Sequence, residues 1–261
     1  MGKADTFYIE SMEEFVSRVR TFREKWDEEE LWFRGVSSPR RGRLRPSLYR
    51  SPLPAMEGAA RKKEDEARIE FSRRGHALVL EREPQTNFDW YILMRHNEVP
   101  TRLLDWTEGS LIALYFALRP HGPARPAKNE NAAVWLLDPQ WLNGEAIGKA
   151  EFLLPSDPAV QKYLPKPRAR KQMGLPPVAI LPPYLLRQML TQRSVFTIQG
   201  APNGFDKITA RRGKTRLAKI VVRQSGSDEI LNDLASSGIS EATLFPTLGG
   251  IGKEVTELYL Q

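Results

Sequence analysis

The chain has 261 residues, with 39 Lys and Arg against 32 Asp and Glu, and its formal net charge is therefore +7. It contains no cysteine, which excludes disulfides, thiolate zinc sites, iron–sulfur clusters and cysteine nucleophiles. The three histidines, His76, His96 and His121, lack the spacing of a zinc-binding pair, so we expect no metal site.

The first predicted element is an amphipathic helix over residues 11–26. Ser11 and Glu14 have the spacing of a capping box at its start. Apolar residues then recur at helical spacing on one face, namely Met12, Phe15, Val16, Val19, Phe22 and Trp26. We expect this helix to pack on the core as scaffold.

Residues 31–36 are predicted to form a short strand that places Arg34 near a sheet edge, and a basic loop with two prolines follows. Two helices are expected next, over about 62–83 and 87–98, separated by Pro84. Thr86 has the capping-box spacing to Asp89 at the start of the second of these helices.

The remaining elements are a helix at 110–119, a buried strand at 132–137 and a long loop at 155–177. Further strands are expected at 178–181, 194–198 and 217–223, and helices near 185–192, at 228–235 and at 253–259. Helices thus come mostly before the sheet. We predict one α+β domain over residues 1–261, with N-terminal helices (first 11–26) packed on a small mixed or antiparallel sheet within a core at 31–261.

The densest group of polar side chains lies between two predicted helices, over residues 95–108. Pro100 fixes an extended backbone there, so Thr101, Leu103 and Asp105 are expected to face one way and Arg102, Leu104 and Trp106 the other. Such a run is typical of a functional loop. The alternative is a buried structural ion pair between Arg102 and Asp105.

Arg34 is a second candidate, because aromatic neighbours and Gly35 would allow a phosphate to approach its guanidinium. Alternatively, Arg34 joins a strand to a helix through a buried carboxylate such as Asp105. His96 is a third candidate, with a structural role at a helix end or in the core as the alternative. Gln192 and Ser194 lie at a helix-to-strand junction over residues 187–198, where ordinary packing is again the alternative.

Three stretches, 34–50, 160–171 and 207–223, hold 6, 5 and 7 Lys or Arg and no acid. They predict a nucleic acid or another polyanion as partner. Alternatively, they are solvated loops that balance the acidic N-terminal helix. No apolar run approaches the roughly 18 residues of a membrane helix, and the N-terminus lacks a signal-peptide pattern, so we expect no membrane and a cytoplasmic location.

Several runs of residues resemble the FRG domain, a family of bacteria and phages named after its aromatic-Arg-Gly tripeptide. The matching residues are Trp32-Phe33-Arg34-Gly35, the run from Leu44 to Arg50, His96, the run from Pro100 to Thr107, Ala113–Ala117, Ala133–Trp135, Gln192, Val195–Ile198 and Leu244–Pro246 with Leu248 and Gly250. This sequence departs from the family at residues 95–98, where Gln-His-aromatic-Gly is usual, and at Thr247, where Asp is usual.

The same layout is remotely similar to ADP-ribosyltransferases of the Arg-Ser-Glu type. Those enzymes have an arginine strand, a Ser/Thr strand that leads into an Ala-rich helix, and a Glu or Gln before a late strand. The counterparts here are Arg34, Thr107 and Gln192. The resemblance implies an NAD-using enzyme acting on a nucleic acid or a protein, such as a toxin or phage-defence effector that a protein partner or antitoxin restrains.

The resemblance also implies roles within such a site. Arg34 would hold the NAD diphosphate, and Trp106 or Phe196 would stack on nicotinamide. Gln192 or Glu108 would orient the ribose as the glycosidic bond breaks toward an oxocarbenium ion. Thr107 would serve with them, and His96, Thr101, Arg102 and Asp105 would complete the binding site.

Two other functions remain open. The basic stretches favour a non-catalytic nucleic-acid-binding module. A nuclease holding Mg²⁺ through Asp105, Glu108 and Glu241 is the other alternative. The sequence has no Gly-x-Gly-x-x-Gly, P-loop, Gly-x-Ser-x-Gly or His-Glu-x-x-His motif, so dehydrogenases, P-loop ATPases, hydrolases of that type and zincins lack support.

Overall fold

A computed structural model describes residues 5–38, 44–50, 57–79, 81–119, 130–164, 174–209 and 215–260. One seven-stranded mixed sheet runs through it, in the order β1-β7-β4-β2-β3-β6-β5. Its strands are β1 Asp5–Ile9, β2 Trp32–Val36, β3 Leu103–Thr107, β4 Ala132–Leu137, β5 Val178–Ile180, β6 Ser194–Ile198 and β7 Leu217–Val222. The edge pair β1 and β7 is parallel, and the other neighbours are antiparallel. The α+β class and the mixed sheet are thus confirmed.

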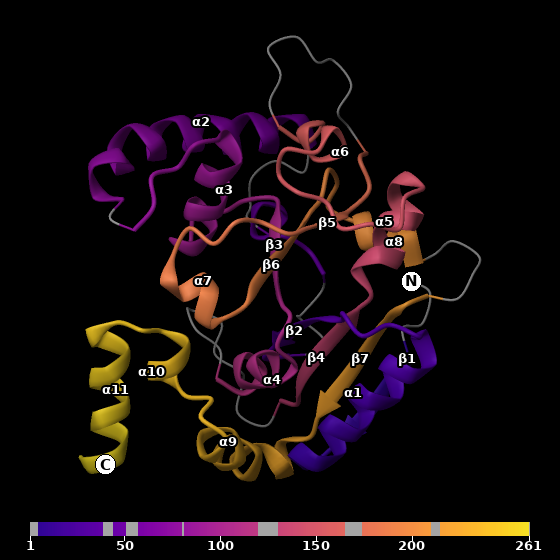
Figure 1. The fold of residues 1–261 in the computed structure, drawn as a ribbon, viewed down its shortest axis with the longest axis vertical. Coiled ribbons are helices and arrows are strands. Elements are labelled where there is room, and N and C mark those ends of the chain that lie inside the picture. The colour runs from indigo at the N-terminus through magenta and orange to yellow at the C-terminus, as the bar shows by residue number, and fades with distance from the viewer. Residues whose placement is uncertain are drawn as a thin grey trace.

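The α-helices are interspersed with the strands along the chain (Figure 1). They are α1 Met12–Trp26, α2 Glu57–Gly75, α3 Asn87–His96, α4 Ser110–Leu118, α5 Pro139–Ile147, α6 Pro158–Gln161, α7 Arg187–Thr191, α8 Gly204–Thr209, α9 Ser227–Ser236, α10 Glu241–Leu244 and α11 Leu248–Tyr259. Short 3-10 turns are η1 Ser47–Tyr49, η2 His76–Leu78 and η3 Gln224–Gly226. Among the described residues, no helix is both long and apolar enough to cross a membrane.

Local capping signals are confirmed at both predicted helix starts. The Ser11 side chain accepts from the Glu14 amide, and Thr86 forms a complete capping box with Asp89. The helix expected at 62–83 was misplaced: α2 begins at 57 and ends at 75, well before Pro84. The expectation that helices come mostly before the sheet was also wrong, since α5 to α8 lie between β4 and β7 and α9 to α11 follow β7.

The core has three apolar clusters, and alternation along the strands assigns them to the two faces of the sheet. On one face, α1, α4 and α9 cover β2, β4 and β7, as the lower half of Figure 1 shows, and α3 covers β3, β5 and β6. On the opposite face, Trp32, Trp106 and Trp135 pack together with residues of α5 and α8. The two halves of the first face therefore meet between β2 and β3.

Gly35 allows β2 to lie directly against α4. A Cβ added at Gly35 would lie 2.1 Å from the Ala113 carbonyl oxygen and 2.5 Å from the Ala117 nitrogen. The backbone of this helix therefore packs on the strand without an intervening side chain. This close approach fixes the position of Arg34, the preceding residue.

Candidate functional site

Strands β2 and β3 are in register at a single pair, Phe33 opposite Thr107. Beyond that pair, β2 continues along β4 and β3 continues along β6, so the sheet splits at Arg34 and Asp105. Arg34 Nη1 donates to the Asp105 backbone oxygen at 2.6 Å and to the carboxylate Oδ2 at 3.4 Å. The Arg34 side chain therefore supplies the hydrogen bond that the Asp105 carbonyl oxygen would otherwise lack at the split.

The Asp105 carboxylate also binds Arg95, which lies in the last turn of α3. Arg95 Nε is 2.9 Å from both carboxylate oxygens, and Nη2 is 2.7 Å from Oδ2. Burial raises the pKa of Asp105, but the charges of Arg95 and Arg34 outweigh burial and hold the pKa below its ordinary range. Asp105 is therefore an ionised anchor for two arginines.

A third guanidinium, that of Arg50, lies close enough to influence the pair electrostatically. Desolvation and then repulsion by Arg95 lower the pKa of Arg50, while Asp105 opposes both. The Arg50 side chain makes no hydrogen bond or ion pair with another residue that the structure describes. Two guanidiniums therefore bind the Asp105 carboxylate, and the third lies within electrostatic range of it. We call Arg34, Arg50, Arg95 and Asp105 the arginine cluster.

The positive charge of the arginine cluster is only partly compensated. Burial, followed by repulsion from Arg95 and Arg50, lowers the pKa of Arg34 to about 10 despite the attraction of Asp105. The Arg34 Nε atom is buried and has no hydrogen-bond partner among the described residues. The Arg34 and Asp105 side chains are 15% and 35% exposed, so solvent reaches this site. An anion would find unsatisfied donors there.

Thr101, expected to bind substrate, is instead buried and holds the segment that carries Arg50. The Leu48 amide donates to the Thr101 backbone oxygen at 3.2 Å, and the Thr101 amide donates to Ser47 Oγ at 3.2 Å. The two runs Leu44–Arg50 and Pro100–Thr107 are thus bound to each other. Arg50 owes its place to this contact, which local sequence patterns do not reveal.

The alternative pairing of Arg102 with Asp105 is wrong. Arg102 Nε lies 2.5 Å from Glu64 Oε2, and both side chains are 2% exposed. Arg102 Nη2 also donates to the Tyr163 carbonyl oxygen at 2.8 Å. Arg102 and Asp105 face opposite ways along the extended segment, so each takes the partner on its own side. Arg102 joins α2 to the loop after α6.

Trp106 and Phe196 are buried on opposite faces of the sheet. Trp106 is 3% exposed and donates through Nε1 to Thr197 Oγ1 at 3.1 Å, while Phe196 is 1% exposed. Stacking of nicotinamide on either ring therefore gains no support from this geometry. His96 contacts the Phe196 ring edge-on, burial lowers its pKa, and its buried Nε2 has no hydrogen-bond partner among the described residues.

Thr107 and Gln192 meet where β3 ends and β6 begins. Thr107 Oγ1 donates to the Gln192 backbone oxygen at 2.7 Å and accepts from the Gly109 amide at 2.9 Å. The Gln192 side chain donates to the Leu244 carbonyl oxygen at 3.2 Å. Glu108 lies beside them, 3.7 Å from Arg193 Nε. Arg34, Thr107 and Gln192 thus belong to three neighbouring strands, or to their ends.

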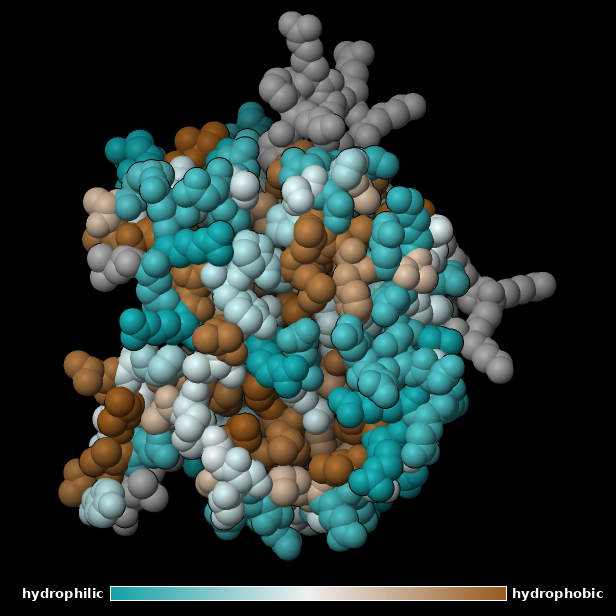
Figure 2. All heavy atoms as spheres, viewed as in Figure 1, coloured by the Kyte–Doolittle hydropathy of each residue, from teal (hydrophilic) through white to brown (hydrophobic). Residues whose placement is uncertain are grey.

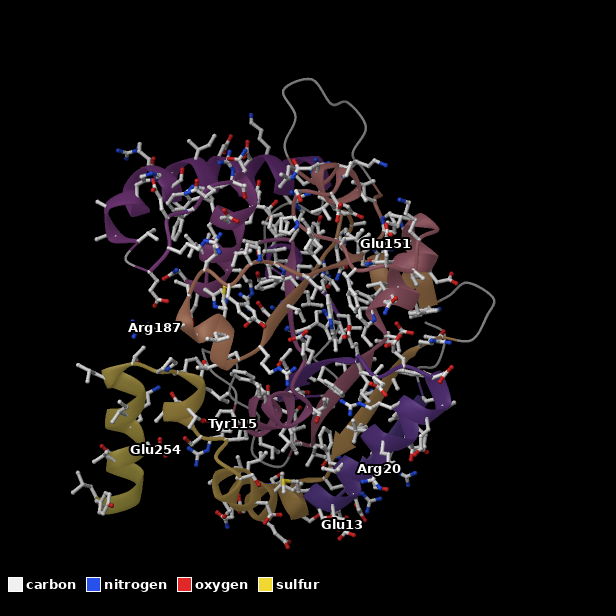
Figure 3. All side chains as sticks on the ribbon, in the orientation of Figure 1. Glu13, Arg20, Tyr115, Glu151, Arg187 and Glu254 are labelled. Atoms are coloured by element: carbon white, nitrogen blue, oxygen red, sulfur yellow. The ribbon has the colours of Figure 1, made fainter. Side chains whose placement is uncertain are left out.

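The three carboxylates of the nuclease alternative do not gather. Glu241 accepts from the hydroxyl of Tyr115, labelled on α4 in Figure 3, at 3.0 Å and from Lys253 Nζ at 2.9 Å. Asp105 is occupied by arginines. Within the described ranges, no group of three or more His, Cys, Asp or Glu side chains is arranged to hold a metal ion.

The three basic stretches lie partly outside the described residues, at 39–43, 165–171 and 210–214. In the last stretch, Arg216 pairs with Asp138 at 2.8 Å and Arg223 pairs with Glu10 at 2.9 Å. Lys219 lies over the Trp135 ring, 5.3 Å from its centre. Acids outside α1 therefore pair with some of these charges, and residues 217–222 form strand β7 rather than a solvated loop.

The structure defines an α+β protein with a split mixed sheet and an arginine cluster at the split. Residues 29–125 match the family model of the FRG domain, which confirms the expected resemblance. This segment contains all four members of the arginine cluster, whereas β1 and β4 to β7 lie outside it. Comparison with curated proteins gave no match, and comparison with solved structures gave none either.

Arg34 and Asp105 were both candidates from sequence, and the structure brings them together. Arg50 and Arg95 were missed as site residues. Both lie in or beside the runs that carry the family resemblance, and that recurrence of arginine was the available signal.

Proposed function

We propose that this protein is an NAD-dependent ADP-ribosyltransferase-like enzyme whose arginine cluster binds the NAD diphosphate. The observation that carries the proposal is the pair of guanidiniums, those of Arg34 and Arg95, on the one carboxylate of Asp105 at the split between β2 and β3, with the positive charge of Arg50 nearby. Because strands from both ends of the chain complete that sheet, the proposal treats residues 1–261 as one functional unit.

A diphosphate suits this cluster for electrostatic reasons. Burial and like charges disfavour the charged form of Arg34, and an anion would offset both effects. Arg50 offers a guanidinium with no hydrogen bond or ion pair to another described residue, and Arg34 Nε is likewise an unused donor within the described part of the chain. Planar guanidiniums bind phosphate oxygens in a bidentate manner, which a lysine does not reproduce.

In the proposed reaction, the bond between nicotinamide nitrogen and ribose C1′ breaks, and its electron pair goes to the nicotinamide. The resulting oxocarbenium ion is attacked by an acceptor atom, which loses its proton as the new bond to C1′ forms. Gln192 or Glu108 is proposed to orient the ribose, and Thr107 fixes Gln192 through its backbone oxygen. Gln192 is 8% exposed, so it would have to leave its bond to Leu244 to contact substrate.

The acceptor is proposed to be a nucleic acid or a protein, and the basic stretches favour a nucleic acid. Binding to RNA or DNA would then weaken steeply as salt concentration rises, because phosphate contacts release counterions. The resemblance to ADP-ribosyltransferases supports a toxin or phage-defence role, and the lack of a membrane-helix or signal-peptide pattern in the sequence supports a cytoplasmic location. Growth arrest on expression, relieved by Arg34→Lys, would support that role.

The diphosphate site is tested first by calorimetric titration of the purified protein with NAD, ADP-ribose and pyrophosphate. We expect all three to bind and Arg50→Ala to weaken each about 10-fold or more, the cost of one lost charge-assisted contact. Arg20→Ala is the matched control, because Arg20 is an exposed arginine on α1, where Figure 3 labels it, and is not a member of the arginine cluster. Equal affinities of Arg50→Ala and Arg20→Ala would refute the site.

Catalysis is tested separately with NAD labelled in its adenylate phosphate, incubated with cell extract, RNA, DNA and protein fractions. The proposal expects nicotinamide release together with transfer of label to one fraction, both lost in Arg34→Lys. Binding without release in any fraction would refute the enzyme and retain the diphosphate site.

A further inference from the structure

Helix α11 turns its polar side toward the protein and its apolar side outward. Glu254 accepts from Ser240 Oγ at 3.1 Å and from the Ala242 amide at 3.2 Å, and Lys253 pairs with Glu241 at 2.9 Å. The outward side carries Leu248, Ile251, Val255 and Tyr259, which are 89%, 49%, 46% and 78% exposed, and Leu260 just after the helix is 76% exposed. An ordinary surface helix has the opposite orientation.

These five side chains, which we call the α11 stripe, lie at the lower left edge of the molecule, where Figure 2 shows hydrophobic spheres on the surface. They present on the order of 600 Å² of apolar surface, the upper end of what one patch on a monomer exposes. The spacing of Leu248, Ile251, Val255 and Tyr259 places these four on one side of the helix, and Leu260 follows directly at its end. The stripe is therefore a candidate interface rather than scattered exposure.

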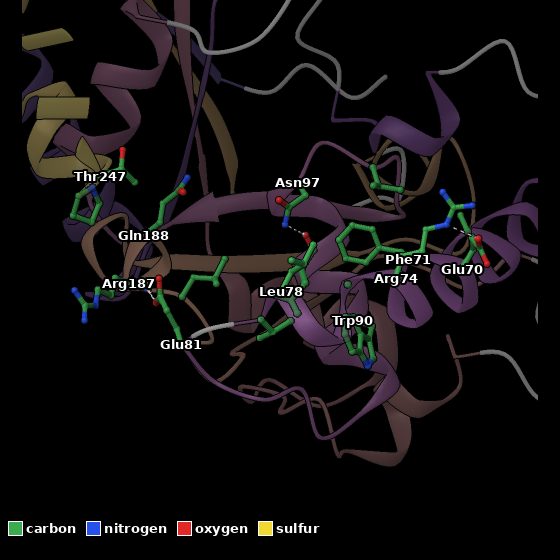
Figure 4. Close-up of a pocket in the computed structure, with 17 residues that line it drawn as sticks. Glu70, Phe71, Arg74, Leu78, Glu81, Trp90, Asn97, Arg187, Gln188 and Thr247 are labelled. Atoms are coloured by element: carbon green, nitrogen blue, oxygen red, sulfur yellow. Dashed lines mark hydrogen bonds and ion pairs between the residues drawn. The ribbon is translucent and has the colours of Figure 1, made fainter. Parts of the chain in front are cut away.

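An apolar groove of about 780 Å³ opens beside the base of the same helix. Phe71, Leu78 and Trp90 line one side of it, and Gln188, Pro246 and Thr247 line the other, as Figure 4 shows for five of these six residues. Thr247 is also the residue that caps α11. Leu78 is 76% exposed at the groove, so this lining is incompletely covered as well.

We propose that the groove receives the α11 stripe of a second copy of this chain. Each of two copies, related by a two-fold axis, places its own stripe in the groove of the other. The chain carries both the helix and the groove of a helix-in-groove contact. A two-fold axis therefore generates two identical contacts, which bury the stripe and the groove of both copies. The stripe and the groove together reach the roughly 800 Å² per copy that a stable interface needs. This inference is independent of the proposed enzyme activity.

The oligomeric state provides the first test, by light scattering and sedimentation of the full chain over a range of concentrations. We expect a dimer, and we expect Val255→Asp to raise its dissociation constant about 100-fold, as for a central contact. Val16→Asp is the matched control, because Val16 on α1 is 41% exposed against 46% for Val255. Circular dichroism of each variant checks that the fold is kept.

A second test uses the absence of cysteine from the chain. Leu78→Cys and Tyr259→Cys are made in separate chains, mixed and oxidised. If each stripe lies in the partner's groove, we expect a mixed disulfide between the two chains. Its yield should exceed that from a mixture of Val16→Cys with Tyr259→Cys. Because each chain carries one thiol, a helix folding back onto its own groove gives no product.

The proposal is overturned if the protein is a monomer at all concentrations. This holds also if the groove of that monomer binds a small apolar dye, because the groove would then be a small-molecule site. The proposal is also overturned by a dimer that Val255→Asp leaves intact, or by mixed disulfide no greater than in the Val16→Cys control.

Discussion

Arg34 and Asp105 bridge the split in the central sheet, where Arg34 Nη1 lies 2.6 Å from the backbone carbonyl oxygen of Asp105. One arginine therefore has two tasks: it completes the hydrogen bonding of β3 and holds positive charge beside a carboxylate. The phosphate and carboxylate interpretations of Arg34 are consequently compatible, since Asp105 uses only part of its donors.

Replacement of Arg34 by Ala should destabilise the protein, because it leaves the Asp105 carbonyl oxygen without its donor. We expect a loss of about 1–3 kcal/mol in the free energy of unfolding, the usual cost of an unsatisfied, partly buried polar group. Urea unfolding of Arg34→Ala and of the exposed control Arg20→Ala measures the difference. Equal stability of the two variants would contradict this role.

The buried pair of Arg102 and Glu64 should be the most sensitive ion pair among the described residues. Both side chains are 2% exposed, so Glu64→Ala should cost about 3–5 kcal/mol by leaving a buried charge unpaired. The surface pair of Arg74 and Glu70 is the comparison, and Arg74→Ala should leave the free energy of unfolding nearly unchanged because solvent screens the pair. If Glu64→Ala and Arg74→Ala changed the free energy of unfolding equally, Arg102 would be satisfied by another residue or by water in the absence of Glu64.

The pH dependence of stability should carry a contribution from Asp105. Its pKa in the folded protein lies below the unfolded value of about 3.9, so the ionised group stabilises the fold. That stabilisation is complete above about pH 4 to 5 and is lost as pH falls through the folded pKa. We expect Asp105→Asn to be less stable at neutral pH and to lose less stability on acidification. If the free energy of unfolding depended on pH in the same way for both proteins, Asp105 would not be the stabilising ionised group.

Gly35 should tolerate no side chain, because a Cβ there meets the backbone of α4. Gly35→Ala should destabilise by about 2 kcal/mol or more, as overpacking against rigid backbone does. Gly58→Ala is the control, since a Cβ at Gly58 meets no atom of a described residue within 4 Å, and it should stabilise α2 by up to about 1 kcal/mol. Thermal unfolding distinguishes the opposite signs.

Several features of the fold followed from the sequence because their causes are local. The apolar runs at 132–137 and 194–198 became β4 and β6, and Thr86 with Asp89 formed the expected capping box. β1 was missed because it is short and mostly exposed, and its partner β7 lies more than 200 residues later. The first turns of α11 were missed because three glycines there weaken the helical pattern.

The sequence by itself determined which residues are chemically noteworthy: Arg34, the run around Asp105 and the junction at Gln192. Only the tertiary structure decided their partners. Arg102 pairs with Glu64, and Asp105 pairs with Arg34 and Arg95. Arg50 lies within electrostatic range of Arg95 and Asp105. The physical reason is that helix periods and caps depend on neighbours within a few residues, whereas a buried charge pairs with whichever opposite charge the packing brings near, at any distance along the chain.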